Sequence, residues 1–94
     1  MKKPTEVSLS VTFFKEGKVF VAYSPALDIS TVGKSLKEVK ANFEELTNLF
    51  FEETENRGTT EDALLSLGWQ KTESRQWQPP VEVEHSIQKV LVPA

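Results

Sequence analysis

The chain has 94 residues, a formal net charge of −3 and no cysteine, and 38% of its residues are apolar. This length allows one domain, and the lack of cysteine excludes a disulfide framework, a thiolate metal site and a thiol nucleophile. The longest apolar runs span only a few residues, which excludes a membrane helix of about 20 apolar residues.

Two segments with alternating apolar residues predict an antiparallel hairpin near the start of the chain. Residues 7–13 alternate apolar with small polar side chains, and residues 19–23 form a second β-prone segment. Gly17 lies in the turn between them. We expect Phe13 to lie opposite Val21, because this register puts all the apolar side chains on one face. These side chains are Val7, Leu9, Val11, Phe13, Val19, Val21 and Tyr23.

A third strand and a long helix are expected next. Residues 29–32 are β-prone, and the short connection from the second strand makes their pairing antiparallel. Ser35-x-x-Glu38 is a capping box that begins a helix over residues 36–56, and Gly58 is typical of a helix end. An apolar stripe at steps of three and four residues predicts that this helix covers the sheet. The stripe consists of Leu36, Val39, Phe43, Leu46 and Phe50.

The remaining residues predict a short second helix and a C-terminal strand. Thr59 and Thr60 begin the helix, which stops at Gly68. Residues 70–80 are polar, and residues 81–92 alternate again and predict a strand. We therefore expect an α+β fold in which a three-stranded antiparallel meander is packed by one long helix, with a core over residues 1–69 and an extension over residues 70–94.

Residue types that carry catalysis or bind cofactors are sparse. His85 is the only histidine, no serine lies in a nucleophile-elbow context, and the four glycines are too far apart for a phosphate-binding loop. We therefore expect no enzyme activity, no metal and no cofactor. The net charge and the missing basic stripe also disfavour direct nucleic-acid binding.

The second half of the long helix is acidic. It has no Lys or Arg between Ala41 and Asn56, an arrangement that the helix macrodipole disfavours. One interpretation is a solvated face, and another is a patch for a cationic partner. A third is a metal-dependent nuclease site, in which Asp28 would join the helix carboxylates. The helix acids are Glu44, Glu45, Glu52, Glu53 and Glu55.

An ordered series of short motifs runs from the second strand to the end of the second helix. The series is Pro25-x-Leu27, Thr31-x-Gly33-x-Ser35, Glu38, Asn42, Glu45-Leu46 and Leu67-Gly68-Trp69. This order resembles the HicB-like antitoxin domain of type II toxin–antitoxin systems, over roughly residues 5–69. The chain departs from that pattern at Asp28, where glycine is usual, and at Val39, where alanine is usual.

The resemblance implies a partial ribonuclease-H-like topology, homodimers or higher oligomers, and a HicA-like toxin as partner. Such a toxin is a small basic protein that cleaves mRNA, and the antitoxin neutralises it. Residues 70–94 are too few for the DNA-binding domain that many family members add. We expect a cytoplasmic protein-binding domain that contacts its partner through Asp28 and the five helix glutamates. The alternative is an orphan module that self-associates and has no toxin partner.

Overall fold

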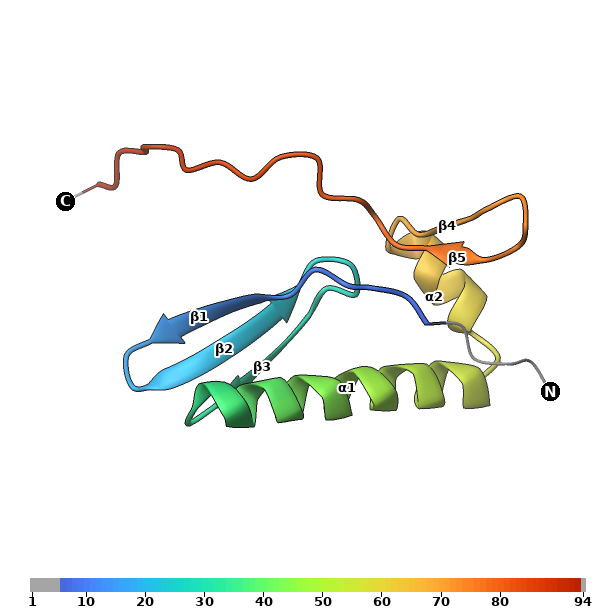
Figure 1. Cartoon of the computed structure of the whole chain (residues 1–94), viewed down its shortest axis with the longest axis horizontal. Coiled ribbons are helices and arrows are strands. Elements are labelled where there is room, and N and C mark those ends of the chain that lie inside the picture. The colour runs from blue at the N-terminus through green and yellow to red at the C-terminus, as the bar shows by residue number, and fades with distance from the viewer. Residues whose placement is uncertain (1–5, 94) are drawn as a thin grey trace.

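Three antiparallel strands lie along one long helix in the computed structural model, which describes residues 6–93 (Figure 1). The elements in chain order are β1 (Thr12–Glu16), β2 (Val19–Ser24), β3 (Ile29–Gly33), α1 (Leu36–Asn56), α2 (Thr60–Ser66), β4 (Gln70–Lys71) and β5 (Trp77–Gln78). The first sheet has the order β1-β2-β3, and β4 pairs with β5 in a second sheet. The predicted α+β class is therefore confirmed. Residues 1–5 and 94, at the ends of the predicted core and extension, lie outside the described part of the chain.

Helix α1 begins and ends where the sequence predicts. The Ser35 hydroxyl accepts a hydrogen bond of 3.0 Å from the Glu38 amide, which gives one free N–H of the first turn a partner. Gly58 follows the helix with a φ of 68°, a left-handed conformation that glycine adopts without steric cost. The Ser35 cap and the terminal glycine thus define the length of the longest element.

The sheet and α1 meet in a first core cluster of Ala22, Val39 and Phe43. Gly33 permits the close approach, because a Cβ atom there would lie 2.6 Å from the Val39 amide nitrogen. The predicted stripe therefore does pack on the sheet, through its second and third members. Its other members are two half-buried side chains and one exposed side chain, Leu46, Phe50 and Leu36.

A second core cluster joins the β2–β3 turn to α2 and the residue that follows α2's terminal glycine. Its buried members are Ala26, Leu27, Leu64 and Trp69. Trp69 is only 2% exposed, and its indole Nε1–H donates a 2.7 Å hydrogen bond to the Ala26 carbonyl. A buried indole needs such a partner, so Trp69 ties the end of α2 to the sheet.

The pairing of β1 with β2 differs from the predicted register by one residue. Phe13 lies opposite Ala22, and Phe14 lies opposite Val21. The cause is a two-residue loop between the strands, in which Gly17 has a φ of 61° at the first central position, as in a type II′ hairpin turn. The shift reverses the faces of β1. The side of the sheet away from α1, here called the outer face, carries Phe14, Val19, Val21, Tyr23 and Val32.

The strand predicted over residues 7–13 is wrong in its first half. β1 starts at Thr12, because β2 ends just before Pro25 and therefore offers earlier residues no partner. Val7 and Leu9 pack against the second core cluster instead. Their alternation marks burial on one side, which an extended segment outside the sheet also provides.

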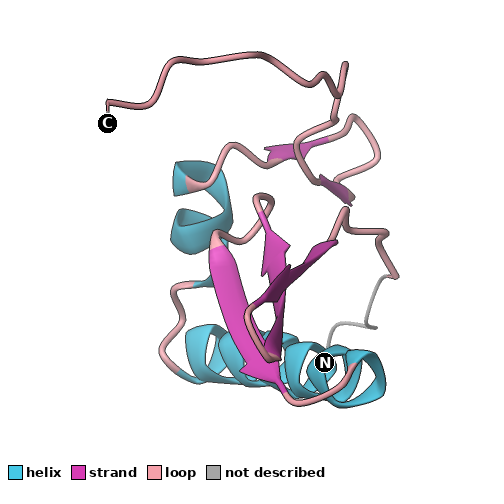
Figure 2. Ribbon diagram, turned by 90° about the vertical axis from the view of Figure 1, so that its left-hand side faces the viewer, coloured by secondary structure: helices cyan, strands magenta, loops and turns pink. Residues whose placement is uncertain are grey.

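The C-terminal strand predicted over residues 81–92 is also wrong for a single copy of the chain. The structure has no strand in residues 81–93, and the polar stretch before them forms the β4–β5 hairpin instead. Figure 2 shows residues 81–93, here called the tail, running clear of the helices and strands. Alternation favours a strand only where an edge is present to pair with it, and the tail meets none.

Candidate partner-binding surface

Four of the predicted glutamates lie on the side of α1 that faces away from the sheet. Residues seven or eleven positions apart return to the same side of an α-helix. Glu45 and Glu52 are related by the first spacing, and Glu44 and Glu55 by the second. All four side chains are exposed. This surface, here called the acidic face, is opposite the side of α1 that packs on the sheet.

The fifth glutamate, Glu53, has a cationic partner. Its Oε1 lies 2.7 Å from Nη2 of Arg57, and the two side chains are 62% and 70% exposed. An ion pair this exposed contributes little to stability, but it neutralises the charge of Glu53. Within residues 6–93, none of the ion pairs involves the acidic face. Its four charges are therefore available to a partner.

The opposite end of α1 is basic. Lys34, Lys37 and Lys40 lie at or just before the first two turns. The Lys40 ammonium lies 5.6 Å from the centre of the Phe13 ring, a cation–π distance that draws it toward the hairpin. Charge is thus separated along α1, and this separation gives the molecule a field that can orient an incoming charged protein.

Asp28 lies in the β2–β3 turn, with a φ of 51°. Aspartate tolerates this left-handed conformation better than most residues, and glycine tolerates it best. Asp28 Oδ1 accepts a 2.9 Å hydrogen bond from the Tyr23 hydroxyl. This hydrogen bond, more than any other influence, raises the pKa of the Tyr23 phenol above its usual range. Because Tyr23 belongs to the outer face, the Asp28 carboxylate lies on that side of the sheet.

The predicted contact residues are therefore divided between two sides of the molecule. The acidic face lies beyond α1, whereas Asp28 lies across the sheet from it. Within residues 6–93, no three histidine, aspartate or glutamate side chains come together as metal ligands. The described residues thus do not assemble the converging carboxylates that the nuclease interpretation requires.

The histidine lies where the tail begins. Ser10 Oγ donates a 3.3 Å hydrogen bond to Glu82, and His85 Nδ1 lies 3.7 Å from the other oxygen of that carboxylate. These residues line a hollow together with Thr12 and Tyr23. Nucleophilic catalysis needs the imidazole to contact the hydroxyl, whereas here Glu82 lies between them. The contacts instead hold the start of the tail beside the start of β1.

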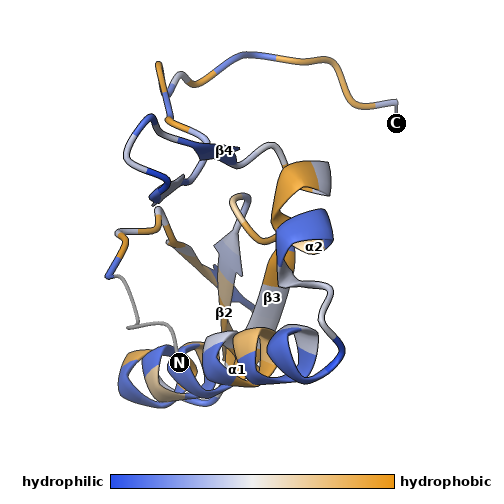
Figure 3. Cartoon of the chain, turned by 90° about the vertical axis from the view of Figure 1, so that its right-hand side faces the viewer, coloured by the Kyte–Doolittle hydropathy of each residue, from blue (hydrophilic) through white to orange (hydrophobic). Residues whose placement is uncertain are grey.

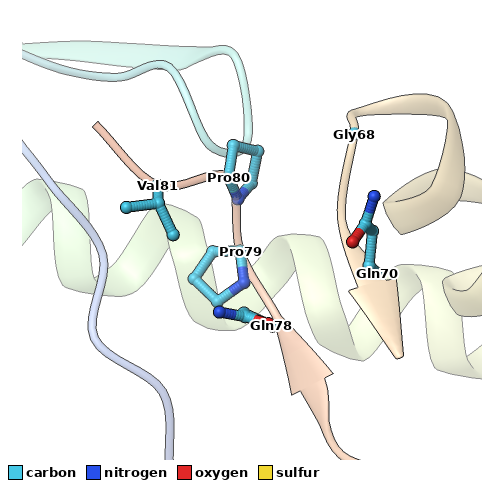
Figure 4. Close-up of a pocket in the computed structure, with 6 residues that line it drawn as sticks. All are labelled: Gly68, Gln70, Gln78, Pro79, Pro80 and Val81. Carbon is cyan, nitrogen blue, oxygen red and sulfur yellow. The ribbon is translucent and has the colours of Figure 1, made fainter. Parts of the chain in front are cut away.

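A second hollow lies where the tail leaves β5 (Figure 4). Its lining residues are Gly68, Gln70, Gln78, Pro79, Pro80 and Val81. These residues present amides, pyrrolidine rings and a methyl-bearing side chain, so the hollow offers no acid, base or charged ligand. The two prolines fix the backbone φ and so set the direction in which the tail departs.

Sequence reasoning missed a row of apolar side chains on the outer face. Phe14, Val21 and Val32 lie opposite one another across the three strands, and Phe14 and Val32 are 45% and 55% exposed. The signal that could have revealed this row is Gly17, because a two-residue loop sets the register of its hairpin. The outer face is thus an apolar surface beside the start of the tail.

Comparisons with known proteins add no assignment to these surfaces. No family model, no curated protein and no solved structure matches the chain. None of the helices in residues 6–93 is long and apolar enough to span a lipid bilayer. The acidic face, the outer face and the tail are therefore the features on which a function can be proposed.

Proposed function

We propose that the chain is an antitoxin-like protein-binding domain that neutralises a small basic mRNA-cleaving protein of the HicA type. The observation that carries the proposal is the acidic face, whose four exposed glutamates have no cationic partner within residues 6–93. The ordered motifs that resemble the HicB-like domain support the same assignment. In this role the chain acts in the cytoplasm, needs no cofactor and makes no direct contact with nucleic acid.

The acidic face can neutralise such a partner in two ways. Its charge steers a basic protein toward α1 and raises the association rate, most strongly at low ionic strength. In the bound state the carboxylates occupy the cationic groups with which a ribonuclease would hold RNA phosphates. The two polyanions then compete for one surface, so binding the domain excludes the RNA.

The proposal is tested by co-purification with the product of a short basic reading frame next to the gene, and by mRNA cleavage by that product. The variant Glu45→Lys/Glu52→Lys reverses two charges of the acidic face. We expect it to bind at least about tenfold more weakly, because like charges then meet across the interface. Both positions are exposed and lysine is a good helix former, so circular dichroism should show α1 intact.

The matched control is Glu16→Lys/Glu73→Lys, which changes the net charge equally at two exposed positions outside α1. We expect this control to bind and inhibit like the wild type. Unchanged binding by the α1 variant would overturn the role of the acidic face. Equal weakening by both variants would assign the interaction to overall charge.

The second candidate is a self-associating module without a toxin partner. It is favoured by the exposed apolar side chains of the outer face and the tail, which are unusual on a monomer. A homodimer or higher oligomer is compatible with both candidates. The mass of the purified full chain in solution, measured by light scattering, tests the second one directly, since a monomer at high concentration would overturn it.

A further inference from the structure

We propose that the tail of one copy of the chain pairs with the free edge of β1 in a second copy, and that two copies exchange tails reciprocally. This proposal deepens the self-association named above as the second candidate and is independent of any toxin partner. The occupant of the β1 edge is thus a defined segment, residues 81–92 of another copy.

The tail is extended, apolar and unpaired. Val83, Ile87 and Leu91 are 95%, 93% and 100% exposed, and Figure 3 shows hydrophobic stretches along the tail. Within residues 6–93, the tail makes no backbone hydrogen bond to the rest of the chain. Apolar groups in water and β-prone backbone without a ladder both gain from strand pairing.

The first part of the tail also has the side-chain order of a strand with one mainly apolar face. Val81, Val83 and Ile87 are separated by even numbers of residues, so they would lie on one side, together with His85 and Lys89. The order changes after Gln88, because Val90 and Val92 would lie on the other side. Glu82 and Glu84 would lie on the other. An isolated segment does not need this order, whereas a strand joined to a sheet does.

β1 offers a free edge of matching character. One of its edges pairs with β2, and the other has no partner strand among the described residues. All five residues of β1 are exposed, and Phe13 and Phe14 lie on opposite faces with 37% and 45% of their surface accessible. β1 contains no proline, and its two charged residues, Lys15 and Glu16, lie at the end next to the hairpin turn, so its first three residues form an uncharged edge that can take an added strand.

The direction of the tail favours a second copy over the tail's own β1. Thr12 and Val81 line the same hollow, and Ser10 contacts Glu82, so the tail and β1 start at the same place. From there both run in the same direction (Figure 1). A tail could therefore join its own β1 only as a parallel strand, whereas the tail of a second copy can join as an antiparallel one, which is the more stable pairing.

Charge favours the same arrangement. Antiparallel pairing places the acidic start of the tail, with Glu82 and Glu84, beside the hairpin turn, where Lys15 and Lys18 outnumber the single acid Glu16. Parallel pairing places it beside the uncharged start of β1. Opposite charges on neighbouring strands stabilise a pairing and specify its direction.

The exchange has the size of a specific interface. An extended segment over residues 81–92 is about 40 Å long, and its twelve residues with the five of β1 bring each copy close to the roughly 20 residues a side of a stable complex. A two-fold exchange fills the free β1 edge of both copies. The assembly is therefore closed and does not grow into a fibre.

The first test measures the dimer dissociation constant of the full chain by sedimentation equilibrium. We expect Val83→Asp/Ile87→Asp to weaken the dimer at least about tenfold, which is about 1.4 kcal/mol. Both side chains are exposed in one copy, so the fold should be unaffected. The matched control Ser86→Asp/Gln88→Asp adds the same charge on the polar side of the tail, and we expect it to remain dimeric.

The second test uses the natural absence of cysteine. A copy with Lys15→Cys is mixed with a copy that carries Glu84→Cys and is then oxidised, and we expect a cross-linked mixed dimer. A single chain that carries both Lys15→Cys and Glu84→Cys is oxidised in parallel. If this chain forms an internal cross-link and the mixture of single variants forms no mixed dimer, the tail joins its own β1 and the exchange is overturned. A dimer that Val83→Asp/Ile87→Asp does not weaken would overturn the exchange but not self-association, whereas a monomeric full chain would overturn both.

Discussion

Asp28 makes a local hydrogen bond although its backbone has a left-handed conformation that most residues avoid. Its φ of 51° suits glycine better. The carboxylate nevertheless accepts the Tyr23 hydroxyl at 2.9 Å. The aspartate thereby links the β2–β3 turn to the outer face, on the side where the tail begins.

The Asp28→Gly variant should lower the pKa of Tyr23 toward about 10, the usual value for a tyrosine, because it removes the carboxylate whose hydrogen bond raises that pKa. In the wild type the unfolded chain ionises first, so this contribution to stability is present below pH 10 and is lost as pH rises through the folded pKa. Tyr23 is the only tyrosine, so ultraviolet absorbance reports its titration alone. Asp62→Gly is the control, and an unchanged midpoint in Asp28→Gly would contradict the role of the hydrogen bond.

Among the elements, α1 could be predicted completely because its signals are local. The Ser35 hydroxyl, the apolar period and Gly58 act within one or two turns of the residues they affect. The apolar pattern predicted the wrong register for β1, because the two-residue loop at Gly17 sets the pairing regardless of where the apolar side chains then lie. A strand also needs a partner, and the tail has none in one copy.

The candidate partner-binding surface could also be predicted from the sequence only where its signals are local. Exposure of the acidic face follows from helical period alone, so the sequence suffices to predict it. The pairing of Glu53 with Arg57 is a spacing of four residues and could have been foreseen. The separation of Asp28 from these glutamates depends on which face of the sheet Tyr23 occupies. Tyr23 lies on the outer face because its neighbour in β2, Ala22, packs on Val39 and Phe43 of α1.

The contact between β3 and α1 should be sensitive to a single methyl group. Gly33→Ala would put a Cβ atom 2.6 Å from the backbone nitrogen of Val39, so strand and helix must separate. We expect a loss of about 1–3 kcal/mol in the free energy of unfolding, as for other overpacked cores. Urea denaturation measures it, with Ser30→Ala on the outer face of the same strand as control. Equal stability of Gly33→Ala and the wild type would show that this contact yields easily.

For the molecule as a whole, the tail increases the longest dimension but adds no residue to the two core clusters. The protein measures 53 × 28 × 20 Å, whereas a helix of the length of α1 spans about 32 Å. The tail is exposed throughout its described residues, so it adds length without joining either core cluster. Within one copy, the described residues hold the tail only at its start, where Glu82 contacts Ser10, so a second copy is needed to bury its apolar side chains.

The end of the folded core should accordingly lie near Gln78. Trp77 of β5 packs against the second core cluster, and Trp69 is buried in it, so the β4–β5 hairpin belongs with the sheet and helices. A chain that ends after Gln78 should keep the urea midpoint of the full chain, provided that both are measured at a concentration where the full chain is monomeric.

A chain that ends after Gly68 should behave differently, because it lacks both tryptophans. Loss of a buried Trp costs about 3–5 kcal/mol, a large part of the roughly 5–15 kcal/mol that stabilises a domain. We therefore expect this shorter chain to be largely unfolded, with most of the helical signal lost from its far-ultraviolet circular dichroism spectrum. If both truncations lose stability equally, the tail packs on its own core, and the division of the molecule into a core and a free tail is wrong.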